Sequence, residues 1–266
     1  AAAAEVGADG VKGPATGAGV IEVKSPSQLQ IMRQAGRVVQ ELLEHLKRSV
    51  KPGVMTLELD ELARGTLTRL GARSAFKGYH GYPANICTSV NDEVVHGIPS
   101  RRRLKAGDVI GVDVGSIVDG YYSDAALTLS VGEISPEAQE LLNVTEDALM
   151  LGIDQAREGN RLSDISNAIQ TKVEAHGYSV VREFVGHGIG TQLHEPPQIP
   201  NYGAPAYGPG LKAGKLLAIE PIVNRGRAEV RVLPDGWTAV TKDGSLSAHF
   251  EHTIVVSGGE SEILTG

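Results

Sequence analysis

The sequence predicts an α+β fold made of two similar halves. In each half, two amphipathic helices precede a run of strand-like segments, and a Ser-Pro pair opens the first helix both times, at Ser25-Pro26 and at Ser135-Pro136. A duplicated unit of this kind would place the strands of the two halves side by side, with helices on one face and a cleft between the halves. The length of 266 residues is ample for one domain with its own core.

The composition excludes several classes of protein. Hydrophobic residues make up 41% of the chain and charged residues 21%, which is typical of folded globular proteins and not of disordered ones. The net charge of −7 argues against a general nucleic-acid binder, and no apolar run approaches the roughly 18 residues of a membrane helix. Because the chain has a single cysteine, Cys87, any metal must be held by oxygen and nitrogen.

The first twenty residues differ from the rest of the chain. Residues 1–20 consist mainly of alanine and glycine, without the Arg-rich pattern of a transit peptide or the apolar core of a secretory signal. Such a segment buries too little surface to offset the entropy of ordering. We therefore expect residues 1–20 to be a flexible tail and residues 21–266 to form a single domain.

The elements of the first half follow from caps, periodicity and breakers. Ser25 is a typical N-cap and Pro26 suits the first helical position, so a helix is expected to begin there and run to about Ser49. A second helix is expected from an N-cap at Thr56 to a stop at Gly71. From there, strand-like chain with turn residues continues through His96 to Val131.

The second half repeats this order. A third helix is expected from Ser135 to about Glu158-Gly159, and a fourth from an N-cap at Ser163 to Gly177. The strand-like segments that follow are Val180–Phe184, Leu216–Ile222, Val230–Val232 and His249–Val256.

Two aspartates flank a hairpin signal. Asp119-Gly120 is a strong two-residue turn, and pairing around it places Asp113 opposite Ala126 and Asp124 opposite Gly115. Asp113 and Asp124 then lie diagonally on one face, roughly 7–8 Å apart at Cα. Two carboxylates at that separation can share a pair of metal ions about 3.5–4 Å apart. The alternative is a pair of solvent-facing acids, which the apolar neighbours of Asp113 disfavour.

Three further residues, His187, Glu220 and Glu251, extend this donor set, and a second histidine lies near the first in the sequence. His187 stands between glycines, which allow close approach of backbone and ligand, and His194 follows just before Pro196-Pro197. Glu220 and Glu251 lie in apolar segments without Lys or Arg, where an ionised carboxylate is costly unless it is paired or metal-bound. Oxygen-rich ligands with one imidazole suit Mn²⁺, Fe²⁺, Co²⁺ or Zn²⁺.

These segments together resemble the type I methionine aminopeptidases, the pita-bread metalloenzymes that remove initiator methionine. The matching motifs, from about Ser25 to Thr265, are GYHGYP (78–83), VVHGIP (94–99), VDV and SDA around the two aspartates, GHGIG (186–190), LHEPP (193–197), IEP (219–221) and FEHT (250–253). The resemblance implies a pseudo-two-fold repeat with a central cleft that holds two divalent ions, which could be Co, Mn, Fe or Zn. It assigns the metal-ligand positions to Asp113, Asp124, His187, Glu220 and Glu251.

The resemblance also implies a mechanism and a substrate. Water activated by the two metals would attack the first peptide bond of a nascent chain that begins with Met, with Glu220 relaying the proton and His96 and His194 contacting the substrate. The methionine pocket would be lined by Phe76, Tyr79, Tyr82, Cys87, Leu193 and Trp237. Phe76 and Leu193 depart from the residues usual in the family, which bears on the shape of this pocket.

Two alternatives and several partner assignments stay open at this point. A prolidase or Xaa-Pro aminopeptidase would share the fold but carry an extra N-terminal domain, and a metal-free scaffold would have lost catalysis. Arg101-Arg102-Arg103 is a dense basic cluster, interpreted either as solvated loop charge or as a contact with ribosomal RNA. We expect a cytoplasmic monomer of bacterial or organelle type.

Overall fold

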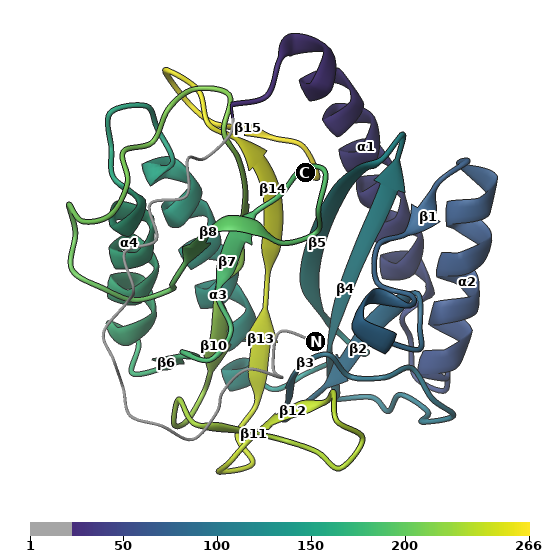
Figure 1. The fold of residues 1–266 in the computed structure, drawn as a ribbon. Coiled ribbons are helices and arrows are strands. Elements are labelled where there is room, and N and C mark those ends of the chain that lie inside the picture. Colours follow the sequence, from purple (N-terminus) through teal and green to yellow (C-terminus); the bar gives the residue numbers. More distant parts are fainter. Residues whose placement is uncertain (1–22) are drawn as a thin grey trace.

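The computed structural model describes residues 23–266, so the predicted tail at residues 1–20 lies outside the described residues (Figure 1). Helices α1 (Pro26–Ser49) and α2 (Thr56–Arg69) precede the first strands, and α3 (Pro136–Gln155) and α4 (Leu162–Glu174) precede the later ones. The predicted order of two helices followed by strands is therefore present twice, and the α+β class is confirmed.

The strands of both halves join in one central sheet. Within residues 23–266 its order is β1-β4-β5-β14-β9-β7-β8, with β2 added to β4 and β15 added to β14. Two three-stranded sheets, β13-β10-β6 and β11-β12-β3, complete the fold. The strand bounds are β1 Arg73–Ser74, β2 Ile86–Val90, β3 Glu93–Val95, β4 Val109–Val118, β5 Tyr121–Ser130, β6 Ser179–Val180, β7 Gly186–Gly188, β8 Glu195–Ile199, β9 Leu216–Ile219, β10 Ile222–Asn224, β11 Val230–Val232, β12 Ala239–Thr241, β13 Ser247–His249, β14 Glu251–Val255 and β15 Glu262–Ile263.

Each half has its own apolar core between its helices and the sheet. Leu42, Leu46 and Leu59 of α1 and α2 pack with residues of β2 and β4. Leu141 and Ile165 of α3 and α4 pack instead with residues of β9, β13 and β14. The two helix pairs consequently lie on opposite sides of the molecule in Figure 1, with the central strands between them.

The hairpin between β4 and β5 has the predicted register. Val118 pairs with Tyr121, so Asp119 and Gly120 form the two-residue loop, and both have positive φ, of 47° and 81°. Positive φ at both loop positions is the geometry of the type I′ turn, which matches the twist of the strands. Asp113 therefore pairs with Ala126, and Asp124 with Gly115, as expected.

Two predicted N-caps are wrong for the same physical reason. Helix α2 is capped at Met55, whose N–H donates to the carboxylate of Glu58, whereas the hydroxyl of Thr56 is bonded to the backbone of Ser100. Helix α4 is capped at Arg161, whose N–H donates to Asp164. In both cases the carboxylate of an acidic side chain in the first turn accepts a hydrogen bond from the backbone N–H of the N-cap residue.

Several predicted boundaries also differ from the structure. Helix α3 ends at Gln155 rather than near Gly159, and Val180–Phe184 contributes only the short β6. The segment Leu216–Ile222 is divided into β9 and β10 at Glu220-Pro221, where the proline has no N–H to donate to a ladder. The segment His249–Val256 is likewise divided at Phe250, between β13 and β14. Glu220 and Glu251 thus lie at strand breaks.

Candidate metal centre

The register of three strands brings the acidic side chains to one face of the sheet. Ala126 of β5 pairs with Asp113 of β4 on one side and with Glu251 of β14 on the other. Residues directly opposite each other share a face, and so do residues two apart on a strand. Asp124, two residues before Ala126, therefore joins Asp113 and Glu251.

The remaining two residues reach the same face from β9 and β7. Ile219 pairs with His252, so the next pair along the ladder would place Glu220 beside Glu251. His187 of β7 pairs with Ala218, which lies two residues before Glu220. Donors from both halves of the chain thus meet in the middle of the sheet.

The glycines beside His187 allow close approach of backbone, as expected. A Cβ on Gly186 would lie 2.5 Å from the carbonyl oxygen of Ala218, and one on Gly188 would lie 2.3 Å from that of Pro196. Both glycines are therefore required for the close approach of neighbouring backbone. That tight packing holds β7 between β8 and β9 and fixes where His187 stands.

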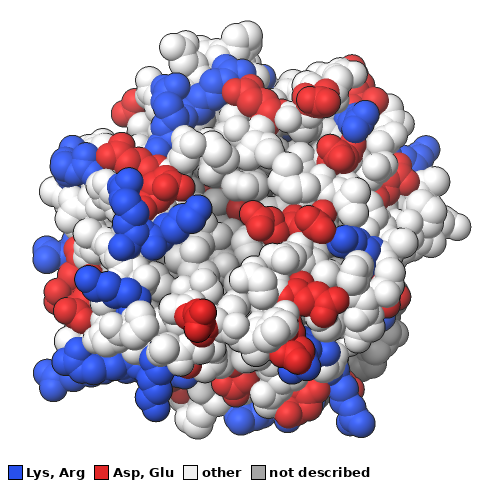
Figure 2. Space-filling model, turned by 180° about the vertical axis from the view of Figure 1, so that it is seen from behind, with Lys and Arg blue, Asp and Glu red and all other residues white. Residues whose placement is uncertain are grey.

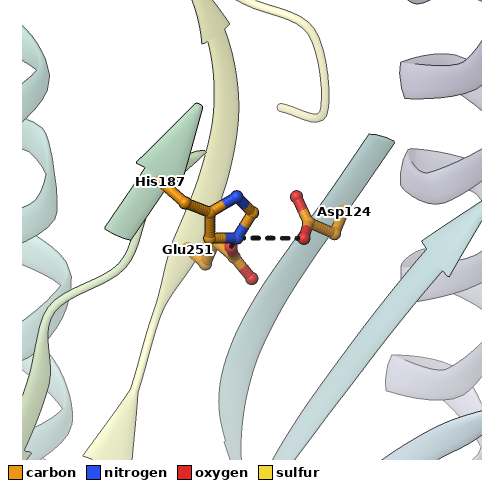
Figure 3. A group of neighbouring side chains, drawn as sticks. All are labelled: Asp124, His187 and Glu251. Carbon is orange, nitrogen blue, oxygen red and sulfur yellow. Dashed lines mark ion pairs between the residues drawn. The ribbon is translucent and has the colours of Figure 1, made fainter. Parts of the chain in front are cut away.

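The ring of His187 faces three carboxylates. Its Nε2 lies 3.5 Å from Oδ2 of Asp124, 3.6 Å from Oε1 of Glu220 and 3.9 Å from Oε1 of Glu251. Figure 3 shows His187 directed toward Asp124 and Glu251, each carried by a different strand. Ligand atoms of these three buried residues all lie within 4.8 Å of one another.

Hydrogen bonding determines which ring nitrogen of His187 faces the acids with a lone pair. Nδ1 lies 2.8 Å from the carbonyl oxygen of Gly188, which can only accept, so Nδ1 carries the proton. In the neutral ring, Nε2 then presents a lone pair to the carboxylate oxygens, which is repulsive without a cation between them. This arrangement is typical of metal-ligating histidines, whose other nitrogen donates to a carbonyl or carboxylate.

The donor set fits a divalent cation in two further respects. Oδ1 of Asp113 is buried and has no hydrogen-bond partner in the structure. Burial raises the pKa of Asp113 and of Asp124 to about 8 and that of Glu220 to about 7, and it raises the pKa of Glu251 well above its ordinary value. A bound cation would reverse these shifts by favouring the ionised carboxylates.

All thirteen predicted site residues line one hollow. Beside the five donors, its wall is formed by His96 and His194 and by Phe76, Tyr79, Tyr82, Cys87, Leu193 and Trp237. The structure therefore brings together all the residues that the motifs and the resemblance pointed to. The roles assigned to these residues stay predictions.

The two histidines of the wall are held by aromatic side chains. Nδ1 of His194 lies 2.8 Å from the hydroxyl of Tyr79, and the ring of His96 packs edge-on against Phe184, with centroids 5.3 Å apart. Burial lowers the pKa of both His96 and His194 to about 3. Both rings are therefore neutral near pH 7 and can each donate one N–H.

The apolar part of the hollow lies next to the donors. Cys87 of β2 pairs directly with Asp113, and burial raises the pKa of its thiol well above the ordinary value. Phe76 packs against Gly115, where a Cβ would lie 2.9 Å from the phenyl ring. The hollow thus offers a neutral, apolar wall for a side chain beside a polar floor.

One residue of the centre was missed by the sequence reasoning. His249 of β13 is buried, and its Nε2 lies 3.4 Å from Oε2 of Glu220. Burial lowers its pKa. The signal that could have found it is the spacing of two residues between His249 and Glu251, which is typical of side chains on one face of a strand.

The basic cluster at residues 101–103 has partners within the protein. All three arginines are exposed, but Arg102 forms an ion pair of 2.9 Å with Glu93, and Arg103 donates to the carbonyl oxygen of Gly53. The cluster lies outside the hollow.

A further observation concerns membranes: between residues 23 and 266, no helix combines the length and apolar character needed to cross a bilayer.

A family comparison bears directly on the donor cluster. Residues 30–258 match the pattern of metallopeptidase family M24. The chain belongs to metallopeptidase family M24. This M24 chain therefore uses a divalent metal in catalysis, which agrees with the five clustered donors.

Relatives within family M24 are similar over nearly the whole chain. The methionine aminopeptidase of Clostridium perfringens is 50% identical over 246 residues, which covers 92% of this chain and 99% of the relative. Methionine aminopeptidase 1 of Bacillus subtilis is 52% identical with the same coverage. The predicted resemblance to methionine aminopeptidases is confirmed at the level of the family.

Solved structures confirm the pita-bread fold for this M24 chain. The crystal structure of methionine aminopeptidase from Thermotoga maritima matches with a TM-score of 0.91 and 46% identity, covering 92% of this chain and 99% of the other. The Xaa-Pro dipeptidase of Bacillus anthracis matches with a TM-score of 0.73, but it is only 23% identical, and the match covers 61% of its chain. The second likeness shows the fold alone.

Proposed function

We propose that this chain is a methionine aminopeptidase that removes the initiator methionine from nascent polypeptides, with residues 21–266 acting as one catalytic domain. The observation that carries the proposal is the adjacency of the five-donor cluster and an apolar pocket in one hollow. A metal site alone would serve many hydrolases. A metal site beside a neutral pocket of aromatic and aliphatic walls suits a substrate with an apolar first residue.

The five donors are proposed to hold two divalent cations, drawn from Mn²⁺, Fe²⁺, Co²⁺ or Zn²⁺. Asp113, Asp124, His187, Glu220 and Glu251 supply carboxylate oxygens and one imidazole nitrogen, which suits these ions better than a thiolate site. When bound, such cations polarise a carbonyl and lower the pKa of water. The number and identity of the ions can be measured by metal analysis of the protein after loading with each ion in turn.

The protein groups around the donors supply the remaining chemistry. Glu220 faces the hollow and is proposed to take the proton of the attacking water and deliver it to the leaving amine. His96 and His194 are proposed to donate hydrogen bonds to the carbonyl oxygen and the amide of the substrate, and such a donor contributes about 3 kcal/mol when charge develops on oxygen. Phe76, Leu193 and Trp237 would exclude water from around the methionine side chain.

The proposal is tested by hydrolysis of matched peptides. Purified protein loaded with Mn²⁺ is expected to release Met from Met-Ala-Ser and to lose this activity on treatment with a chelator. Ala-Pro-Ala is the comparison peptide, because an Xaa-Pro aminopeptidase would prefer it. Faster cleavage of Ala-Pro-Ala would contradict the methionine specificity, and fewer than one ion bound per chain would favour a scaffold without catalysis.

The surroundings of the enzyme are part of the proposal. We infer a cytoplasmic monomer that meets its substrates near the ribosome, with Arg101–Arg103 contacting RNA phosphates. Residues 23–105 contain fourteen Lys and Arg against seven Asp and Glu, although the whole chain is acidic. Seen from behind in Figure 2, basic side chains gather toward the left, the side of α1 and α2. Phosphate contacts depend on such positive charge.

The RNA contact is tested by co-sedimentation with ribosomes. Replacing Arg101, Arg102 and Arg103 by Gln is expected to weaken binding while peptide hydrolysis is retained. The matched control replaces three basic residues on the α3–α4 side, namely Arg157, Arg161 and Lys172. Equal co-sedimentation of both triple variants would show that the cluster is only solvated loop charge.

A further inference from the structure

His249 is a buried histidine with an unpartnered ring nitrogen beside the metal donors. Its exposed fraction is 4%, and Nε2 has no hydrogen-bond partner in the structure. A buried polar group left without a partner costs roughly 1–3 kcal/mol. The nearby acceptor is Oε2 of Glu220, 3.4 Å away, so a small side-chain rotation that aligns the N–H with this oxygen would complete a hydrogen bond.

The backbone around His249 fixes where this ring can be. Its N–H donates to the hydroxyl of Thr128, and the same hydroxyl donates to the His249 carbonyl oxygen, each over 2.9 Å. On the other side, His249 pairs with Ile222 at the start of β10, two residues after Glu220. The strand that carries His249 is therefore anchored both to β5 and to the chain that leaves Glu220.

The carboxylate of Glu220 lies between two imidazole rings. Oε1 is 3.6 Å from Nε2 of His187, and Oε2 is 3.4 Å from Nε2 of His249. In the neutral ring, Nε2 of His187 carries no proton when its Nδ1 donates to the carbonyl oxygen of Gly188. His249 is thus the imidazole able to donate to Glu220.

We propose that His249 is a positioning residue for Glu220: its Nε2–H donates to Oε2, which fixes the carboxylate plane and directs Oε1 toward the cavity and His187. Glu220 lies at a strand break before Pro221, and its backbone carbonyl oxygen accepts a hydrogen bond from the side-chain amide of Asn201. The expected effect on catalysis rests on the proposed function, whereas the hydrogen bond between His249 and Glu220 does not depend on it.

Two variants of His249 distinguish the loss of its hydrogen-bond donor from the loss of its side-chain volume. His249→Gln keeps an N–H donor on a shorter side chain, whereas His249→Met fills similar space without one. His252→Gln is the matched control, since His252 alternates to the opposite face of β14 and its ring is bonded to Thr265. Removing a group that orients a ligand typically costs about 10–100-fold in metal affinity or activity.

We expect kcat and Mn²⁺ affinity to fall in the variant without an N–H donor and to be largely retained in the variant that keeps one. In His249→Met, kcat for Met-Ala-Ser and the affinity for Mn²⁺ measured by calorimetry should each fall about 10–100-fold, with KM changed less than about 3-fold. His249→Gln should recover most of both, and His252→Gln should resemble the wild type. Equal Mn²⁺ affinity in His249→Met and the wild type, or equal losses in the Met and Gln variants, would overturn the proposal.

A measurement on the unmodified protein covers the case in which a variant does not fold. ¹⁵N NMR of the imidazole nitrogens, with His249 assigned through His249→Gln or by its contacts, is expected to show the proton on Nε2. A proton on Nδ1 would contradict the inference. If the wild type binds Mn²⁺ but releases no Met, the proposed function fails, while the NMR and affinity measurements still decide the role of His249.

Discussion

The side chains of Asp124 and Glu251 are buried, and Nε2 of His187 lies 3.5 Å and 3.9 Å from their carboxylate oxygens. Like charges close together in a buried site destabilise the protein unless a cation offsets them. The carboxylates of Asp124 and Glu251 therefore lower the stability of the metal-free protein and raise the stability of the metal-bound protein.

Asp124→Asn separates these two effects. Above about pH 8, where the Asp124 carboxyl is ionised in the metal-free protein, the variant is expected to melt at the same temperature as the wild type or higher, because one buried charge is removed. Its gain in stability on adding Mn²⁺ should disappear, whereas the wild type should gain about 2.7 kcal/mol at a free concentration of 100 times Kd. Met release should fall by more than about 100-fold, beyond the loss seen for groups that only support a ligand. Scanning calorimetry with and without Mn²⁺ measures the stabilities, and a normal Mn²⁺ response would refute the ligand role.

Tyr79 offers a test of how His194 is held. Tyr79→Phe removes the hydroxyl 2.8 Å from Nδ1 of His194 and leaves the ring in place. We expect kcat for Met-Ala-Ser to fall about 10-fold, because the imidazole loses the bond that fixes its tautomer. The control is Tyr207→Phe, at a side chain that is 68% exposed. Steady-state kinetics that are identical for both variants would exclude this role of Tyr79.

At the scale of the elements, the position of His187 depends on how closely β7 packs against its neighbours. Gly188→Ala would place a Cβ 2.3 Å from the carbonyl oxygen of Pro196, so backbone must move. We expect a loss of about 1–3 kcal/mol in the free energy of unfolding, together with weaker Mn²⁺ binding. The measurements are urea denaturation and calorimetry.

A second glycine provides the matched control. Gly65 lies within α2 and is exposed, and a Cβ added there would meet no heavy atom of a neighbouring side chain or strand within 4 Å. Gly65→Ala should therefore stabilise the protein by about 0.5–1 kcal/mol through helix propensity. Similar effects of the two substitutions would show that the strand contacts at Gly188 are not the cause.

At the scale of the whole molecule, an ion pair ties the first helix to the last strand. Arg33 of α1 binds Glu262 of β15 through two hydrogen bonds of 2.7 Å. The Arg33 guanidinium lowers the pKa of Glu262 below its ordinary value of 4.5. Because the folded-state pKa is the lower one, the pair stabilises the protein above about pH 4.5, and this contribution is lost as the pH falls through the folded-state pKa.

Glu262→Gln tests this dependence. At pH 7 the variant should be less stable than the wild type by up to about 1 kcal/mol, since both side chains are partly exposed. At pH 3 the free energies of unfolding of the variant and the wild type should become similar. The readout is the difference in the free energy of unfolding between the two proteins across this range, and a difference that grows on acidification would contradict the assignment.

Local patterns were sufficient for much of the fold and of the candidate site. Asp119-Gly120 specified a turn whose register fixed Asp113 and Asp124 on one face, because side chains alternate strictly along paired strands. Acids inside apolar segments marked Glu220 and Glu251, because an unpaired buried charge is costly. Ser25 and Ser135 marked helix starts, because their hydroxyl groups satisfy free N–H groups.

The errors arose where distant parts of the chain compete with local preference. Thr56 does not cap its helix because its hydroxyl is bonded to Ser100, 44 residues away. The close approach of backbone at the glycines beside His187 was expected, but only the fold identifies the neighbouring carbonyl groups as those of Ala218 and Pro196.

By itself, the sequence determined the kinds of donor and the hairpin register, since these follow from side-chain chemistry and from contacts close in the chain, whereas the lining of the hollow was implied by the resemblance to a known family. Only the tertiary structure decided how the halves meet: β14 pairs with both β5 and β9, which brings Glu251 between donors more than 30 residues apart along the chain. It also placed His249 against Glu220, because strand breaks at Pro221 and Phe250 set directions that no local pattern specifies.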